Sequence, residues 1–109
     1  MPEIPDLENI CTILTDAIGG ETIESVELLK PNIVRMVPDE FEARVVGTAI
    51  ESIDRYGKFL LFHLSSGDQI ALNMMLVGRL QHVEPSKKRG KSACWVLGLS
   101  DGCELRYLD

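Results

Sequence analysis

The stretch Arg-Tyr-Gly-Lys-Phe-Leu-Leu-Phe at residues 55–62 decides the fold of this chain. Gly57 lets the backbone bend, so the residues on its two sides are expected to form neighbouring strands of one hairpin. Phe59 to Phe62 is apolar at every position, whereas a half-exposed strand would alternate apolar and polar residues. We therefore expect this strand to lie centrally, between two layers of the protein.

Strand patterns continue around this hairpin, from Ala49 to the end of the chain. Two breaks between them, Ser65-Ser66-Gly67-Asp68 and Ser100-Asp101-Gly102, contain glycine and aspartate, which tolerate the positive φ that hairpin turns require. The expected strands cover residues 50–55, 59–64, 69–75, 78–83, 93–99 and 103–108.

The part of the chain before Ala49 adds two expected helices. Apolar residues recur at helical spacing from Leu7 to Ile18, Asp6 is a suitable N-cap, and Gly19-Gly20 ends the helix. The second helix is expected over residues 38–47, with Pro38 in its first turn. Extended segments are expected at residues 22–29 and 33–37. The sequence thus predicts a mainly β chain with two helices, arranged as an antiparallel β-sandwich.

Composition sets broad limits on the class of protein. The 109 residues are 45% hydrophobic, but no apolar run approaches the ~20 residues of a membrane helix, and no basic-then-apolar leader is present. Cys11, Cys94 and Cys103 form no C-x-x-C pair, which predicts three reduced thiols. Neither His63 nor His82 has a cysteine or acid at ligand spacing. We expect a cytoplasmic monomer with no targeting segment, and no metal or cofactor in this chain.

The charge of the chain limits its use as a nucleic-acid binder. Seventeen acidic residues face eleven basic ones, a net charge of -6, whereas a self-sufficient binder usually has a basic surface. Any such role must be local or shared. The one basic stretch, Lys87-Lys88-Arg89-Gly90-Lys91, is either a phosphate-contacting loop or a solvated hairpin connection, and the second is commoner for a charge run between apolar segments.

The start of the chain, Met1-Pro2-Glu3, offers an unusual nucleophile. Removal of Met1 would expose a secondary amine on Pro2, and α-amino groups titrate near ~8. Such an amine condenses with an aldehyde carbon to give an iminium, which promotes elimination at the neighbouring carbon. On these residues alone an ordinary processed start, with Glu3 as a surface carboxylate, is the better interpretation.

Four segments together resemble the formamidopyrimidine-DNA glycosylase and endonuclease VIII family of base-excision-repair enzymes. They are residues 1–8, 55–61, 73–80 and 106–109, in the family's order and spacing. The resemblance covers the whole chain, residues 1–109, but only the family's N-terminal catalytic domain. Members continue with a helix-two-turn-helix and usually a finger, so a zinc ion is implied only for that finger. Damaged double-stranded DNA is the implied partner.

The resemblance assigns chemistry to the start of the chain. Pro2 would attack the sugar C1′ of a damaged nucleotide and expel the base. Glu3 would act as a general acid at the sugar ring oxygen, which requires a raised carboxyl pKa. Asp6 and Glu8 are nearby carboxylates at the helix start. Asp6 stands where the family usually has glutamate, and a simple helix cap is the better interpretation of it.

The resemblance also implies a set of DNA contacts. Lys58 would bind the phosphate beside the lesion, with Arg55 as a second candidate, instead of being an ordinary exposed hairpin lysine. Leu76 occupies the place of the wedge residue that fills the void left by an everted nucleotide. Asn73 replaces a usual histidine, and Arg106 begins the arginine-tyrosine-x-aspartate motif at the end of the chain.

These inferences predict the N-terminal domain of a bacterial, nucleoid-associated DNA glycosylase and abasic-site lyase that removes oxidised bases, purine lesions being preferred. The 109-residue chain alone is expected to be inactive. One alternative is a non-catalytic DNA- or protein-binding domain of the same fold, which the acidic charge favours. A second is a tautomerase that uses Pro2 as a general base, against which the long β-rich half argues.

Overall fold

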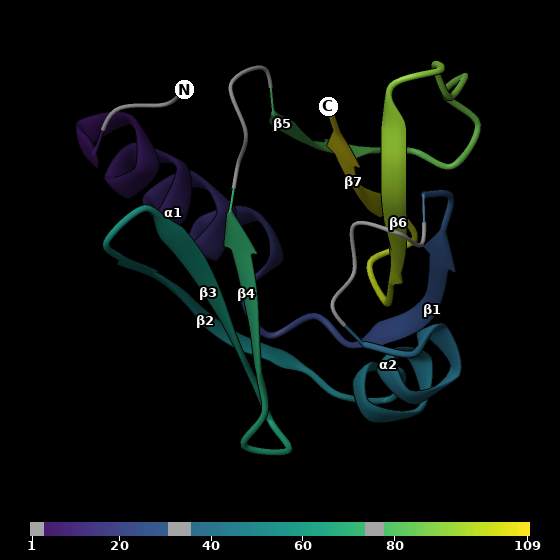
Figure 1. Cartoon of the computed structure of the whole chain (residues 1–109), viewed down its shortest axis with the longest axis horizontal. Coiled ribbons are helices and arrows are strands. Elements are labelled where there is room, and N and C mark those ends of the chain that lie inside the picture. Colours follow the sequence, from purple (N-terminus) through teal and green to yellow (C-terminus); the bar gives the residue numbers. More distant parts are fainter. Residues whose placement is uncertain (1–3, 31–35, 74–77) are drawn as a thin grey trace.

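The computed structural model describes residues 4–30, 36–73 and 78–109, with residues 4–6 described by their backbone alone. These residues form two helices and seven strands (Figure 1). In chain order they are α1 (Ile4–Ile18), β1 (Ile23–Leu28), α2 (Pro38–Val45), β2 (Ile50–Tyr56), β3 (Phe59–Leu64), β4 (Gln69–Asn73), β5 (Arg79–Val83), β6 (Ala93–Leu99) and β7 (Glu104–Leu108). Neither of these helices is long and apolar enough to cross a membrane.

The strands form two antiparallel sheets that pack against each other (Figure 1). One sheet has the strand order β1-β6-β7-β5, and the other has the order β2-β3-β4. Apolar side chains from both sheets and both helices meet in one hydrophobic core. The predicted antiparallel β-sandwich with two helices is therefore confirmed.

Strand β3 lies in the middle of its sheet, paired with β2 on one side and β4 on the other. Leu60, Phe62 and Leu64 are at most 2% exposed and belong to the core. The alternate residues Leu61 and His63 are only partly buried. The prediction of a central strand is confirmed, whereas full burial is confined to the face that carries Leu60, Phe62 and Leu64.

Helix α1 packs on the sandwich through one apolar stripe. Its buried residues recur every three or four positions, which places them on one face of the helix; they are Leu7, Cys11, Leu14 and Ile18. Gly20 follows the helix with a φ of +86°. This left-handed conformation is readily adopted by glycine and is a common way to end a helix.

The start of α1 differs from the prediction. The helix begins at Ile4, so Asp6 lies within its first turn and not at the N-cap. Pro5 explains the earlier start, because proline has the φ of a helix and needs no hydrogen-bond partner for its nitrogen in the first turn. Helix α2 agrees with the prediction, since Pro38 begins it and Gly47 follows its last turn with a φ of +89°.

The remaining strand limits agree with the predictions to within about two residues, the usual uncertainty of element ends. Two expected segments extend beyond the described residues: the extended stretch 33–37 and the end of the strand expected over 69–75. Within the described part, Val37 has extended backbone angles and precedes α2.

The basic stretch 87–91 connects β5 to β6, which lie on opposite sides of β7. It is therefore not the hairpin connection that was predicted. Arg89 anchors it to two strands, because its guanidinium pairs with Glu27 of β1 at 2.6 Å and with Glu104 of β7 at 3.1 Å. Hydrogen bonds from Arg89 hold the pKa of the Glu27 carboxyl below its usual value. The lysines of the stretch are exposed.

Candidate functional site

Three predicted site residues, Pro2, Glu3 and Leu76, lie outside the described residues, but the elements that adjoin them in the chain are described. Helix α1 begins directly after Glu3, and β4 and β5 flank the segment that contains Leu76. The start of α1, the end of β4 and the start of β5 all lie toward the upper end of the molecule in Figure 1. These described neighbours therefore share one end of the sandwich.

Lys58 lies at the tip of the β2–β3 hairpin, as the sequence predicted. Gly57 has a φ of +60°, and Tyr56 pairs with Phe59 across the turn. The Lys58 side chain is exposed and makes no ion pair within the described part of the chain. Tyr56 is 75% exposed and Phe59 is 42% exposed. The turn therefore presents an exposed ammonium group on a hairpin that also carries two exposed aromatic residues, which suits a phosphate and the sugar next to it.

Arg55 connects this hairpin to α1. One guanidinium nitrogen, Nη2, lies 3.3 Å from the Glu8 carboxylate, and the other, Nη1, donates a hydrogen bond to the Gly57 carbonyl at 2.9 Å. The structure thus gives Arg55 and Glu8 a positioning role, because their contacts fix the Lys58 turn beside the start of the helix.

Asn73 ends β4 on the far side of β3 from that contact. It pairs with Phe59 in the β3–β4 ladder, and its side chain is exposed. Residues that pair directly in an antiparallel ladder have side chains on the same face of the sheet. Asn73 is therefore brought close to the Lys58 turn, although the two positions lie in different predicted motifs.

Arg106 lies in the interior of the protein and is only 1% exposed. Its Nη2 lies 2.8 Å from the Glu104 carboxylate and donates to the Lys87 carbonyl, also at 2.8 Å. A buried charge requires such partners. The structure therefore gives Arg106 a structural role, anchoring the connection between β5 and β6, in place of the predicted contact with DNA.

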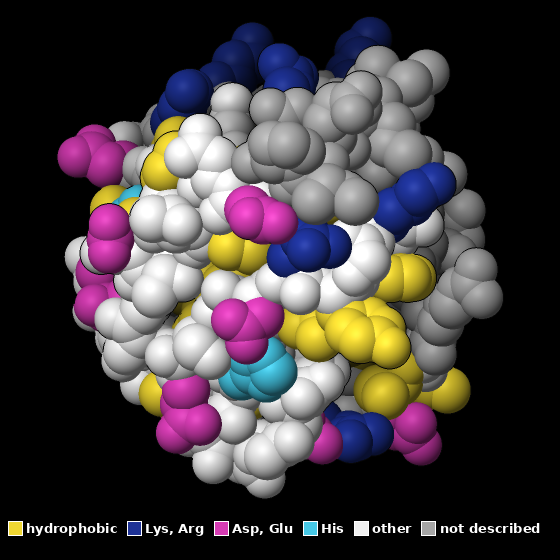
Figure 2. Space-filling view, turned by 90° about the vertical axis from the view of Figure 1, so that its left-hand side faces the viewer, with side chains coloured by type: hydrophobic (Ala, Val, Ile, Leu, Met, Phe, Trp, Pro, Cys, Tyr) yellow, Lys and Arg dark blue, Asp and Glu magenta, His cyan; other side chains and the backbone are white. Residues whose placement is uncertain are grey.

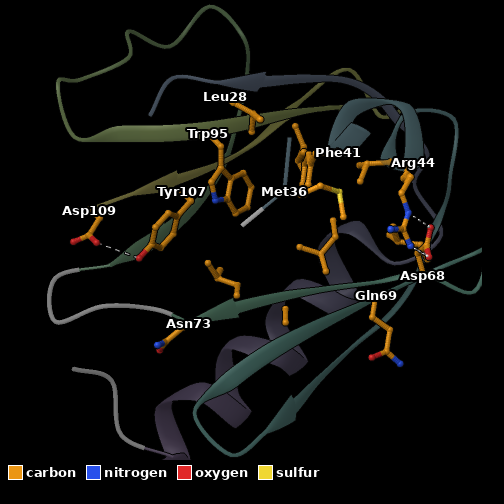
Figure 3. A pocket seen from close by; sticks show the side chains of 16 residues that line it. Leu28, Met36, Phe41, Arg44, Asp68, Gln69, Asn73, Trp95, Tyr107 and Asp109 are labelled. Carbon is orange, nitrogen blue, oxygen red and sulfur yellow. Dashed lines mark hydrogen bonds and ion pairs between the residues drawn. The ribbon is translucent and has the colours of Figure 1, made fainter. Parts of the chain in front are cut away.

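A cavity of about 590 Å³ lies between the two sheets (Figure 3). Trp95 stacks on Tyr107 with ring centroids 5.7 Å apart, and both line this cavity. The ion pair of Arg44 and Asp68 lies at one end of the cavity, and Asn73 and Asp109 lie at the other (Figure 3). The cavity was not predicted, because its lining residues come from α2, from several strands and from the ends of the loops between them, which the sequence does not show to be neighbours.

Charge is unevenly distributed over the surface. Figure 2 looks at the molecule from the side of α1 and shows Lys and Arg side chains gathered along the upper rim, with most Asp and Glu side chains below them. The upper rim is the end toward which α1 begins and β4 ends (Figure 1). A locally basic surface therefore exists on a chain whose net charge is -6.

The described residues thus form a two-layer antiparallel sandwich, with a helix at its start and an exposed lysine turn beside that helix. The family model described as the formamidopyrimidine-DNA glycosylase N-terminal domain matches residues 1–109. The chain therefore belongs to the formamidopyrimidine-DNA glycosylase family, as its resemblance implied.

Among its curated relatives is the formamidopyrimidine-DNA glycosylase of Bacillus subtilis (strain 168), which is 36% identical over 111 residues. The enzyme of the same name from Lactobacillus johnsonii is 35% identical over 109 residues. Each match covers the whole of this chain, but it covers only 40% of the relative. The chain thus spans less than half the length of these relatives.

Solved structures of the same enzyme have the same fold. The Lactococcus lactis glycosylase bound non-covalently to DNA containing an AP site has a TM-score of 0.93 and 23% identity over 99% of this chain and 41% of that one. A mutant of the L. lactis enzyme with DNA containing Fapy-dG has a TM-score of 0.92 and 25% identity, over 99% of this chain and 40% of that one.

Proposed function

We propose that this chain is the N-terminal catalytic domain of a DNA glycosylase and abasic-site lyase that removes oxidised bases, preferably purines, from double-stranded DNA. The observation that carries the proposal is the family match over residues 1–109, together with the exposed Lys58 turn fixed beside the start of α1. The relatives are bacterial enzymes. We accordingly expect a monomer in the bacterial cytoplasm, associated with the nucleoid.

In this proposal, the Pro2 nitrogen attacks C1′ of the damaged nucleotide after Met1 is removed. The glycosidic bond breaks, and the base departs with the electron pair of that bond. Protonation of the ring oxygen by Glu3 opens the sugar, which leaves C1′ bound to nitrogen as an iminium. The iminium acidifies the proton on C2′, whose loss expels the 3′ phosphate and cuts the strand.

The described residues support the positioning that this chemistry needs. Helix α1 begins at Ile4, directly after Glu3 in the chain, and the N-terminus of a helix favours nearby negative charge such as a phosphate. Lys58 lies on a turn that Arg55 and Glu8 hold against the same helix. The two cationic features would grip the DNA backbone around C1′, and Leu76 would fill the space left by the everted nucleotide.

We infer that the 109-residue chain has little or no turnover alone. It matches 40% of its curated relatives, and the missing part is where family resemblance places the helix-two-turn-helix and finger. Its net charge of -6 opposes DNA binding. The rest of the phosphate contacts would have to come from outside these residues.

The test is borohydride trapping in a chimera in which this chain replaces the matching 40% of the B. subtilis enzyme. With Pro2 verified as the N-terminal residue, we expect a covalent adduct with abasic-site DNA, detected by mass spectrometry. Pro2→Gly and a form that retains Met1 serve as controls, and both should abolish the adduct. A folded chimera that gives no adduct would exclude the lyase mechanism.

The net charge favours a second candidate, a non-catalytic domain that binds DNA or protein. The same experiment separates it from the first, because such a chimera would bind DNA without forming an adduct. The tautomerase alternative has lost its support, since the described strands pair only as antiparallel sheets and contain no βαβ unit.

A further inference from the structure

Three side chains with metal-binding atoms meet at the turn between β6 and β7. They are His82 of β5, Asp101 of the turn and Cys103 just before β7, and their ligand atoms all lie within 4.8 Å of one another. No sequence motif indicated this cluster, because nineteen residues separate His82 from Asp101. Pairing of β5 with β7 brings the two segments together.

The backbone fixes the cluster in place. The Cys103 N–H donates a hydrogen bond to Asp101 Oδ1 at 2.8 Å, and the other carboxylate oxygen, Oδ2, lies 2.7 Å from His82 Nε2. Gly102, with a φ of +85°, allows the tight turn between the two ligands. The side chains of His82 and Asp101 are 26% and 21% exposed, so the cluster is partly enclosed but open to a solvated ion.

We propose that His82, Asp101 and Cys103 form a binding site for a divalent transition metal of the Zn²⁺ type. Imidazole, thiolate and carboxylate in one cluster suit zinc better than magnesium or calcium, which take oxygen ligands only. A water molecule would complete the four ligands of a tetrahedral ion. This proposal is independent of the proposed glycosylase activity.

For the pair of His82 and Asp101, a metal ion requires only a small change in spacing. Two ligands at about 2.0–2.1 Å from a tetrahedral ion lie about 3.3 Å apart, so His82 Nε2 and Asp101 Oδ2 must separate by roughly 0.6 Å. Cys103 Sγ lies within 4.8 Å of both atoms and would have to approach the ion as well. The metal would then replace the hydrogen bond that now joins the two side chains.

A metal ion at this site would link the edge strand β5 to the turn between β6 and β7. Strand β5 pairs only with β7 among the described strands, so its outer side is unpaired. The β6–β7 turn lies at the lower end of β6, away from the upper end toward which α1 begins (Figure 1). We therefore assign the site a structural role, separate from DNA.

The test is titration of the metal-free 109-residue chain, which has its own hydrophobic core, with Co²⁺. We expect one equivalent to produce visible d–d bands and a thiolate-to-cobalt charge-transfer band, both removed by Zn²⁺. One equivalent of Zn²⁺ should also raise the Tm by roughly 5 °C or more, as expected for saturating binding to a small domain.

Variants locate the site. Cys103→Ser should abolish the charge-transfer band, and His82→Gln should weaken Co²⁺ binding at least tenfold. His63→Gln is the matched control, because His63 also pairs with a carboxylate, Asp54 at 2.8 Å, but the cluster contains neither residue. Circular dichroism of the metal-free variants checks their folding.

Two results would overturn the proposal. The first is the absence of a stoichiometric cobalt spectrum in the unmodified chain. The second is an unchanged charge-transfer band in Cys103→Ser, which would place the metal on another thiol. The cobalt spectrum is measured on the unmodified chain. The proposal is therefore tested even if a variant misfolds.

Discussion

At the residue scale, two arginines at positions of the family's motifs make contacts within the protein. Arg55 and Arg106 both lie in segments that suggested DNA contact, and both have protein partners instead: Glu8 for Arg55 and Glu104 for Arg106. The sequence alone does not show whether an arginine in a strand points into the protein or toward solvent. Lys58 was predictable as a free cation because it lies beside a glycine turn, where side chains are solvated.

Arg106 makes a sharp test of this structural role. Replacing it with methionine leaves the Glu104 carboxylate, 13% exposed, short of a partner and frees the Lys87 carbonyl. We expect the free energy of unfolding to fall by about 3–5 kcal/mol, as when a buried ion pair loses one member. Urea denaturation provides the measurement. Arg79→Met, at an exposed position on β5, should change stability by no more than about 0.5 kcal/mol, and equal effects of the two substitutions would refute the assignment.

Glu27 gives the domain a defined response to acid. Its pKa is lowered from 4.5 by hydrogen bonds from Arg89, so its stabilisation is present above pH 4.5 and is lost as the pH falls through the lower folded-state pKa. The side chain is 52% exposed, which limits the contribution to about 0–1 kcal/mol. Glu27→Gln should therefore lower the Tm at pH 7, and its Tm should converge with that of the unmodified chain at acid pH, once the pH lies below the lowered folded-state pKa. A Tm difference that stays constant across this range would contradict the assignment.

At the element scale, local sequence patterns predicted where each strand begins and ends. They did not predict which strands pair with each other in a sheet. Apolar runs and turn residues predicted the limits of β3 and β6, because both signals are local to each strand. The basic stretch 87–91 was predicted as a hairpin connection, yet β7 lies between β5 and β6. The cluster around His82 escaped notice for the same reason, since strand order is a long-range property.

The β2–β3 turn offers an element-scale prediction. Gly57 has a φ of +60°, a conformation that costs other residues about 1–2 kcal/mol. Gly57→Ala should destabilise the chain by about 1 kcal/mol and, in the chimera, weaken the grip of Lys58 on DNA. Gly90→Ala is the matched control, because its φ is not left-handed and an added Cβ would meet no atom closer than 3.9 Å. Equal loss of stability in both variants, measured by denaturation, would show that turn geometry is not the cause.

At the scale of the whole molecule, a net charge of -6 and a basic rim exist together. The family, the sandwich and the two helices could be predicted because several short motifs and turn signals agree over the full 109 residues. The predicted catalytic residues Pro2, Glu3 and Leu76 lie outside the described residues, so their roles remain proposals. What the described part adds is the placement of Lys58 and Asn73 beside one another, which depends on strand pairing.

This division of charge predicts how DNA binding depends on salt. Each phosphate neutralised by a protein cation contributes about 0.9 to the slope of log affinity against log salt concentration. In the chimera, Lys58→Gln should reduce that slope by about 1 and weaken binding evenly across sequences. Arg44→Gln removes the same charge beside Asp68, next to the β3–β4 turn at the lower end of the molecule, and should leave the slope unchanged (Figure 1). Fluorescence anisotropy over a range of salt concentrations measures both slopes. If the two variants shift the slope equally, Lys58 acts only through net charge and not through a phosphate contact of its own.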